Sequence, residues 1–218
     1  MIFEPQVPDW GEKLTFNKLN ELIKYHTWLC TTGIKTGLIS PKNEQFIWDE
    51  FIIHSLYFAK IITEMPNIVE EVSDLGTGGG IPGVPIGITT DIKVNLVDIK
   101  EKRVFELSRL LKILDQKNMF SLQEDAEDHI KNGGFFVSRC YISSENVINS
   151  IKKGYKPFVL FLTQIQGINN FKIAKDIDEE YYKNYLIAKK AGVNFIAYRC
   201  KLSSKEIKIE KKIKIIDE

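Results

Sequence analysis

Two stretches near the start of the chain carry apolar residues at helical spacing. Over residues 15–30 apolar side chains recur at intervals of one helical turn, and the pattern stops before Gly33, which predicts an amphipathic helix. Over residues 44–64 apolar side chains occupy more than one face, which predicts a helix buried on several sides. The two segments and the polar loop between them predict a helical extension over residues 1–66.

Beyond Pro66 the pattern changes to short β-favouring runs that alternate with helical ones. The expected strands are residues 69–75, 94–97, 119–122, 135–137 and 158–162. The expected helices are residues 101–114, 144–153 and 178–191. Residues 194–202 and 207–216 flank a turn-like serine pair and predict an antiparallel hairpin. We therefore expect residues 67–218 to form a Rossmann-like α/β domain, with a parallel sheet closed by that hairpin.

The most informative segment is DLGTGGGIPG, residues 74–83, which follows an apolar β-type run and precedes a predicted helix. Its glycines Gly76, Gly78 and Gly80 allow the backbone to turn sharply and to approach a bound ligand, where a Cβ atom would intrude. A glycine turn without a ligand is the alternative interpretation of this segment taken alone. The next predicted strand adds weight to the ligand-binding interpretation.

Asp98 ends that strand, 22 residues after Gly76. At this place a carboxylate accepts hydrogen bonds from both hydroxyls of a ribose and disfavours the 2′-phosphate of NADP. A dinucleotide site has G-x-G-x-x-G at a helix start, whereas D-x-G-x-G-x-G resembles the first motif of methyltransferases. S-adenosylmethionine has no phosphate and carries a sulfonium cation, so Asp74 at the loop entrance is compatible with it. The sequence therefore predicts an S-adenosylmethionine site that includes Asp74, Gly76, Gly78, Gly80 and Asp98.

A third part of the same site is predicted at Asp125, Ala126 and Glu127, directly after the third expected strand. In Rossmann-like methyltransferases this position borders the adenine ring, and a small residue followed by an acid suits backbone recognition of a flat base. Taken alone, EDAED also fits a solvated acidic turn. Its place in the order of strands favours a role beside the adenine.

Charge and composition limit the function further. There are 30 basic and 29 acidic residues, so the net charge of +1 indicates no general preference for nucleic acid, and an RNA site would be a local patch. The acidic, proline-containing start and the lack of a long apolar run predict a cytoplasmic protein without a membrane span. The three cysteines and three histidines are scattered, which argues against a disulfide framework or a metal site.

Four segments, taken in order, resemble one family. They are DLGTGGGIPGVPIGI, KVNLVDIKEKRVFELSRLLKILDQKN, the DAED turn and VSRCY, and the likeness covers roughly residues 14–150. They resemble the bacterial 16S rRNA (guanine-N7) methyltransferase G family, also called glucose-inhibited division protein B. The G-I-P-G-x-P extension of the glycine loop is much more specific than the loop alone.

The resemblance implies roles for individual residues. Gly76 and Ile81 would line the cofactor, and Ala126 and Glu127 would flank the adenine. Arg139 would stand at the active-site mouth, where the family keeps an arginine, and would be both a catalytic candidate and a cofactor contact.

Arg103 resembles a further basic position of the family and is the second catalytic candidate. The alternative for Arg103 is a surface salt bridge with Glu106 or Glu101. For Arg139 such an alternative is weaker, because a charge at the end of a core strand needs a partner.

The implied reaction is direct methyl transfer from S-adenosylmethionine to guanine N7 of 16S ribosomal RNA, alone or in the small-subunit particle. Guanine N7 has a lone pair and no proton to remove, so catalysis would rest on alignment and not on a general base. The implied enzyme is a monomer.

Residues 151–218 resemble the C-terminal segment of a second family, the sugar fermentation stimulation protein A family. The E-x-K strand and F-P-D-A motif that would carry nuclease-like chemistry do not occur in the sequence. The methyltransferase family has a lysine–glycine pair at the end of its fifth strand, and the stretch at residues 162–164 here reads Leu-Thr-Gln. Phe51 and His54 stand at the family's Asp and His positions in the upstream helix. Two alternatives therefore stay open: a DNA-binding protein of the sugar fermentation stimulation type, and a hybrid of two family halves that binds cofactor without catalysis.

Overall fold

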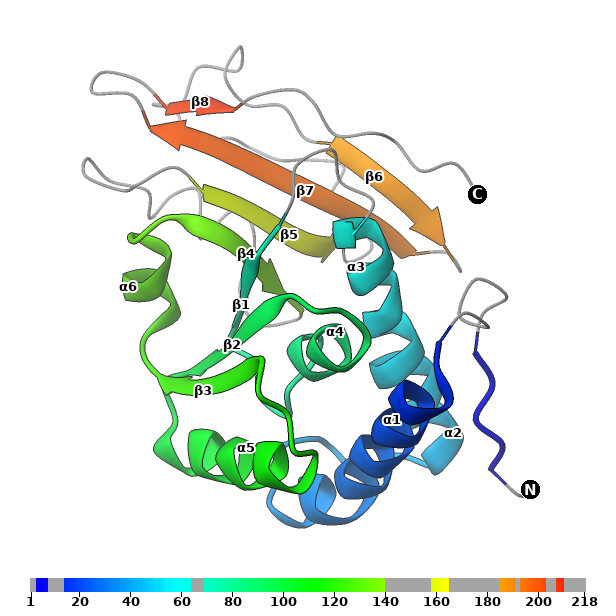
Figure 1. The fold of residues 1–218 in the computed structure, drawn as a ribbon. Coiled ribbons are helices and arrows are strands. Elements are labelled where there is room, and N and C mark those ends of the chain that lie inside the picture. The colour runs from blue at the N-terminus through cyan, green and yellow to red at the C-terminus, as the bar shows by residue number, and fades with distance from the viewer. Residues whose placement is uncertain are drawn as a thin grey trace.

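Two long helical segments open the described part of the chain. A computed structural model describes residues 3–7, 14–63, 69–139, 158–164, 185–190, 193–202 and 207–209. Helix α1, Phe16–Trp28, continues as a π-helical segment, Leu29–Gly33. Helix α2, Glu44–Ile47, continues as a second π-helical segment, Trp48–Ile53, and then as α3, His54–Thr63 (Figure 1). Both helices expected near the N-terminus are confirmed.

Each helical segment starts at a side chain that satisfies a free backbone N–H group. Thr15 Oγ1 accepts a hydrogen bond from the backbone N–H of Lys18 (3.3 Å), and Asn43 Oδ1 accepts one from Phe46 (2.7 Å). Buried apolar side chains of both segments belong to the same core cluster as the side chains of the sheet. The helical extension therefore shares a core with the remainder of the chain, and its boundary at residue 66 stays a prediction.

The described residues form one sheet of eight strands. They are β1 Glu71–Leu75, β2 Lys93–Asp98, β3 Met119–Gln123, β4 Gly134–Ser138, β5 Phe158–Gln164, β6 Tyr185–Lys190, β7 Val193–Leu202 and β8 Ile207–Ile209. Their order is β3-β2-β1-β4-β5-β7-β6, with β8 paired to β7. Strands β1 to β5 are parallel, and β7 is antiparallel to its three partners. The expected Rossmann-like sheet with a closing antiparallel hairpin is confirmed.

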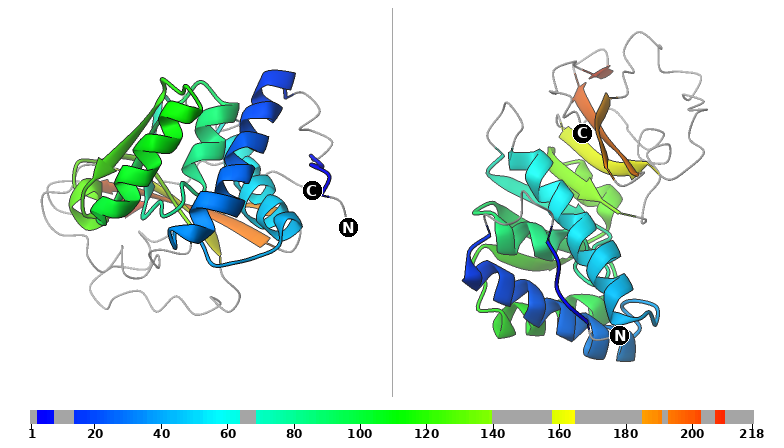
Figure 2. Two further views of the ribbon diagram at one scale, coloured as in Figure 1. Left: turned by 90° about the horizontal axis from the view of Figure 1, so that it is seen from below. Right: turned by 90° about the vertical axis from the view of Figure 1, so that its right-hand side faces the viewer.

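Helices cover the two faces of this sheet unequally. Helices α4, Gly83–Thr89, and α5, Glu101–Ile113, lie on one face together with α1 and α3, whereas α6, Ala126–Ile130, lies apart from them (Figures 1 and 2). Asp74 bonds to the first residue of α4, and the adjacent Ser73 bonds to His129 of α6. Successive side chains of a strand point to opposite faces, so α6 lies on the face opposite α4.

One expected helix is wrong in its second half. Residues 185–190, expected to end a helix over residues 178–191, form β6 and pair with β7. Leucine, alanine and lysine favour helices in isolation, but backbone pairing with a neighbouring strand overrides this propensity. Residues 178–184, the expected helix at 144–153 and the expected strand beyond residue 209 lie outside the described residues. Within the described ranges, no helix has both the length and the apolar composition needed to cross a bilayer.

Candidate functional site

The glycine-rich loop connects β1 to α4 at the carboxyl edge of the parallel strands. Gly76, Gly78 and Gly80 have φ values of 69°, 57° and 92°, in the left-handed region that glycine enters without steric cost. The backbone N–H groups of Gly80 and Ile81 both donate to the carbonyl oxygen of Thr77, at 2.8 and 3.0 Å. The loop is therefore a tight turn held by its own backbone, as the glycine spacing predicts.

The outer side of this loop is open at Gly78. A Cβ atom built there would have one described atom within 4 Å, the carbonyl oxygen of Gly76 at 3.9 Å. On the inner side, a Cβ atom at Gly80 would lie 2.5 Å from Val84 Cγ2. The half-buried side chain of Ile81 packs against the core cluster. The turn thus presents its backbone outward and packs its side chains inward.

Asp74 lies inside the loop. Its side chain is fully buried, and its Oδ2 accepts hydrogen bonds from Thr77 Oγ1 (2.6 Å) and from the backbone N–H of Gly83 (2.8 Å). Burial raises the pKa of this carboxyl from 3.8 to about 7, against the opposing effect of the two donors. The carboxyl therefore ties the end of β1 to the start of α4 and shapes the loop. Its predicted contact with a cationic ligand remains a prediction.

Gly83 leaves no room for a side chain at the start of α4. A Cβ atom there would collide with Leu96 Cδ2 and lie 2.8 Å from Asp74 Oδ2. We expect Gly83→Ala to lower the free energy of unfolding by about 1–3 kcal/mol, because the core must shift to admit the methyl group. Urea unfolding measures this change.

Gly33→Ala is the matched control for that substitution. A Cβ atom at Gly33 would make ordinary contacts, the nearest at 3.4 Å to Leu29 Cδ2, and alanine favours helical backbone over glycine. The control should keep or raise the stability. Equal stability of the two variants would contradict a tight fit at Gly83.

Asp98 faces the glycine loop from the end of β2. Asp98 is 3% exposed. Its Oδ2 accepts a hydrogen bond from the backbone N–H of Gly78 (3.1 Å), and its Oδ1 accepts one from the backbone N–H of Lys100 (3.0 Å). The parallel pairing of β1 with β2 brings together these two motifs, which are 20 residues apart in the chain. The structure thus joins the two parts of the predicted ribose site.

Arg103 also contacts Asp98. Its Nη1 lies 3.0 Å from Asp98 Oδ2, and its side chain is 29% exposed. Among the described residues Asp98 is its ion-pair partner, and Glu106 pairs with Arg109 (3.3 Å) instead. Arg103 therefore does not form the salt bridge with Glu106 or Glu101 that the sequence allows. It lies directly beside Asp98, the carboxylate that is predicted to bind the ribose.

Ala126 and Glu127 begin helix α6 beyond the end of β3. Asp125 caps this helix, since its Oδ1 accepts a hydrogen bond from the backbone N–H of Glu127 (2.8 Å). Ala126 is buried and Glu127 is exposed. The backbone N–H of Glu124 donates to the carbonyl oxygen of Asp98 (3.3 Å). The acidic turn is therefore a helix start, and it lies next to Asp98.

Arg139 follows β4 and packs against the second π-helical segment. Its side chain is 12% exposed, its Nη2 lies 3.8 Å from Glu50 Oε2, and its guanidinium carbon lies 5.3 Å from the ring centroid of Phe51. Burial, and to a smaller extent the positive charge of Arg139, lowers the pKa of His54 from 6.5 to about 3. Residues of the second π-helical segment thus supply the partner that a charged group in this place requires. No local signal in the sequence predicts that Glu50 pairs with Arg139.

The family model for rRNA small subunit methyltransferase G matches residues 18–191. The chain belongs to this family. The match continues past residue 150, where the likeness seen in the sequence ends, and it includes β5 and β6.

Several relatives of the methyltransferase G family cover part of the chain. Ribosomal RNA small subunit methyltransferase G of Bacteroides thetaiotaomicron is 34% identical over 124 residues, which are 56% of this chain and 59% of the relative. That of Flavobacterium johnsoniae is 32% identical over 142 residues, 65% of this chain and 64% of the relative. The sugar fermentation stimulation protein homolog of Pelagibacter ubique is 70% identical over 73 residues, 34% of this chain and 32% of the relative. Both resemblances are confirmed, and this chain spans less than two thirds of each of these relatives.

A solved structure supports the fold. A mutant of MtNAS in complex with S-adenosylmethionine is similar with a TM-score of 0.52 and 9% sequence identity, covering 83% of this chain and 70% of that chain. At this identity the likeness concerns the Rossmann-like fold alone.

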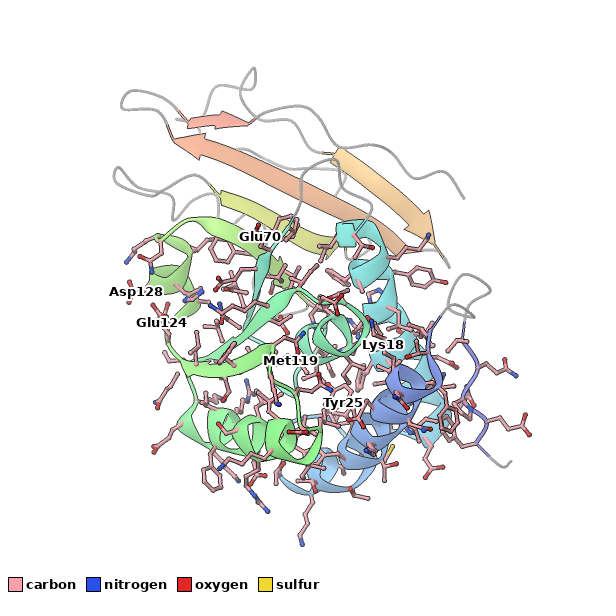
Figure 3. The ribbon with its side chains drawn as sticks, in the orientation of Figure 1. Lys18, Tyr25, Glu70, Met119, Glu124 and Asp128 are labelled. Carbon is pink, nitrogen blue, oxygen red and sulfur yellow. The ribbon has the colours of Figure 1, made fainter. Side chains whose placement is uncertain are left out.

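In this member of the methyltransferase G family, Tyr25 contacts the glycine loop, and the sequence does not predict this contact. It is fully buried on α1, and its hydroxyl donates a hydrogen bond to the carbonyl oxygen of Gly79 at 2.8 Å (Figure 3). Burial raises the pKa of Tyr25 well above 10, so the hydroxyl stays a donor at neutral pH. In the sequence Tyr25 is one apolar-face residue among several, and a contact across 54 positions leaves no local signal.

We expect Tyr25→Phe to loosen the glycine loop. The Gly79 carbonyl would lose its buried donor, which lowers the free energy of unfolding by about 1–3 kcal/mol. Hydrogen exchange should show faster exchange at the amides of Gly80 and Ile81.

Thr89→Val is the control for Tyr25→Phe. It removes a hydroxyl that bonds to the Pro85 carbonyl (2.7 Å) at the far end of α4, and it should leave exchange in the loop unchanged. Unchanged loop exchange in Tyr25→Phe would show that Tyr25 does not hold the loop.

Proposed function

We propose that this chain binds S-adenosylmethionine and transfers its methyl group to guanine N7 of 16S ribosomal RNA. The observation that carries the proposal is the contact between the glycine loop and Asp98, whose Oδ2 lies 3.1 Å from the backbone nitrogen of Gly78. Ligands of open α/β sheets bind at the carboxyl ends of the strands, where this contact lies. Membership of the methyltransferase G family and the names of its members support methyl transfer as the reaction and small-subunit ribosomal RNA as the substrate.

The residues present fit an adenosyl group. Asp98 accepts three hydrogen bonds from the described residues, whereas a carboxylate offers about four acceptor positions, so it retains capacity for a ribose hydroxyl. The open side of Gly78 allows a ligand to approach the backbone. The strand order β3-β2-β1 places Ala126 and Glu127, then Asp98, then the glycine loop along one edge. We assign adenine, ribose and the methionine part to these three places in that order.

The chain's own residues bind and orient in this proposal. Bound S-adenosylmethionine supplies a methyl group on a sulfonium, and guanine N7 supplies a lone pair, so no side chain needs to remove a proton. Arg139 and Arg103 are proposed to attract the RNA phosphates and the O6 acceptor of the target guanine, which leaves the N7 lone pair free to react. Glu50 and Phe51 hold the first arginine, and Asp98 holds the second.

The partner proposed for this site is 16S ribosomal RNA or the small-subunit particle, and the proposed location of the protein is the cytoplasm. Contacts within one copy of the chain join the glycine loop to Asp98 and Asp98 to Arg103, and we propose that the enzyme acts as a monomer. Analytical ultracentrifugation of the purified protein tests the monomer.

Transfer of a labelled methyl group tests the proposed activity. The purified chain, labelled S-adenosylmethionine and small-subunit particles that lack N7 methylation should yield labelled 16S RNA, and reduction followed by aniline cleavage should locate a 7-methylguanosine. Asp98→Ala serves as the inactive reference. Saturable cofactor binding without methyl transfer would establish the hybrid that binds cofactor without catalysis, and absence of cofactor binding would refute the proposal.

A second candidate function is DNA binding of the sugar fermentation stimulation type. The observation that favours it is the 70% identity over 73 residues to the Pelagibacter ubique homolog. A fluorescence anisotropy titration with duplex DNA distinguishes the two functions. DNA binding that persists in Asp98→Ala, together with no methyl transfer by the wild type, would favour the second candidate.

A further inference from the structure

A chain of polar side chains crosses the sheet face opposite α4. His129 of α6 lies with Nε2 2.9 Å from Ser73 Oγ on β1 and with Nδ1 2.7 Å from Glu124 Oε2 after β3. Asn95 on β2 extends the chain, because its Nδ2 lies 3.2 Å from Ser73 Oγ and 2.6 Å from Glu71 Oε1. These bonds connect β1, β2 and Glu124, the residue that follows β3, to α6.

The donors and acceptors of this network agree with one arrangement of protons. The Asn95 amide nitrogen can only donate, so Ser73 Oγ accepts from it, and the Ser73 hydroxyl can donate its own hydrogen to His129 Nε2. In that arrangement His129 Nδ1 donates to Glu124. His129 thus contacts both partners at once. Ser73 and Asn95 are 5% and 7% exposed, and bonds at such buried groups are costly to break.

Helix α6 depends on contacts of this kind. It has five residues, too few to be stable by intrinsic propensity. Asp125 caps its first turn, and His129 ties its last turn to β1 and to the end of β3. Glu124 lies at the α6 end of the sheet (Figure 3). The first two residues of the same helix are those that the proposed function places beside the adenine.

We propose that His129 is a positioning residue for adenine recognition. By bridging Ser73 and Glu124 it fixes α6, and with it the backbone of Ala126 and Glu127, at the adenine end of the site. This inference rests on the proposed function and deepens it, because it assigns base selectivity to a side chain that acts through the helix.

Calorimetric titration with two ligands tests the inference. S-adenosylhomocysteine carries adenine, and S-inosylhomocysteine carries hypoxanthine, which differs at the 6-position of the ring. We expect His129→Ala to bind S-adenosylhomocysteine about tenfold more weakly, the effect of about one lost hydrogen bond. Its preference for adenine over hypoxanthine should shrink by a similar factor, a change that general destabilisation would not produce. His129→Gln, which can hold one of the two partners, should recover part of the preference.

Two further variants sharpen the result. Ser73→Ala should cause no additional loss in the His129→Ala background, because the two residues act through one contact. Asn118→Ala is the matched control: its Nδ2 donates to the carbonyl oxygens of Gly87 (2.9 Å) and Ile92 (3.0 Å) at the opposite edge of the sheet. It should lower the melting temperature and leave the base preference unchanged.

The outcomes separate this inference from the proposed function. A wild type that binds neither ligand would overturn both. A wild type that binds S-adenosylhomocysteine, together with a His129→Ala variant of unchanged affinity and base preference, would overturn the inference alone. An Asn118→Ala variant that loses the preference equally would also overturn it.

Discussion

Asp98→Ala is expected to lower the affinity for S-adenosylmethionine about ten- to a hundredfold. The carboxylate is proposed to accept a hydrogen bond from a ribose hydroxyl, and a bond to a charged acceptor contributes about 1.5–3 kcal/mol. One such bond corresponds to about ten- to a hundredfold in the dissociation constant. The substitution also removes the acceptor of the Gly78 N–H and the partner of Arg103. Isothermal titration calorimetry measures the change.

Asp128→Ala is the control for this prediction. Asp128 lies on α6 and is an exposed carboxylate paired with Lys131. Its loss changes the net charge as much as the loss of Asp98 does, and it does not contact the glycine loop. The control should bind the cofactor as the wild type does. If Asp98→Ala binds as well as Asp128→Ala, the ribose assignment is wrong.

Asp74→Asn is expected to change how stability depends on pH. The folded-state pKa of about 7 lies above the ordinary value of 3.8, so the native protein holds the proton more tightly than the unfolded chain does. The contribution of the protonated carboxyl to stability is complete below about pH 4 and is lost as the pH rises through 7. The two pKa values differ by the equivalent of about 4 kcal/mol.

Urea unfolding of both proteins between pH 4 and pH 8 measures this effect. An amide is neutral throughout, and its oxygen can still accept from Thr77 and Gly83. As the pH rises from 4 to 8, the free energy of unfolding of the asparagine variant should therefore increase by about 4 kcal/mol relative to that of the wild type. All other titrating groups are common to the two proteins, so they cancel in the difference. Parallel stability curves would show that Asp74 is already ionised well below pH 7.

The sequence predicts the parts of the site that are local. The glycine turn, the position of Asp98 and the start of α6 each follow from a few consecutive residues and from the rule that parallel strands end at one edge. Tyr25 and Glu50 could not be predicted, because they reach Gly79 and Arg139 across long stretches of chain. The role of Asp74 was visible only in part: its type suits a cation, but its burial and its bonds to Thr77 and Gly83 arise from packing.

The fold shows the same division. The parallel strands are recognisable as short apolar runs, since both faces of the sheet are covered. The strand β6 was not recognisable, because YLIAKK suits a helix as well as a strand and its pairing with β7 decides the outcome. The network around His129 combines scattered polar residues, and such a combination becomes visible only when β1, β2, the end of β3 and α6 are placed together.

The contacts of Tyr25 and of Glu50 mean that the loop and Arg139 are supported by helices that come before the sheet in the chain. A saturation scan of amino-acid substitutions should therefore yield two separate groups of inactivating positions. One group would follow the ends of β1 to β4, and the other would fall between residues 25 and 51. The second group would include positions that never meet a substrate, and transplanting the sheet without these helices would leave its catalytic edge without support.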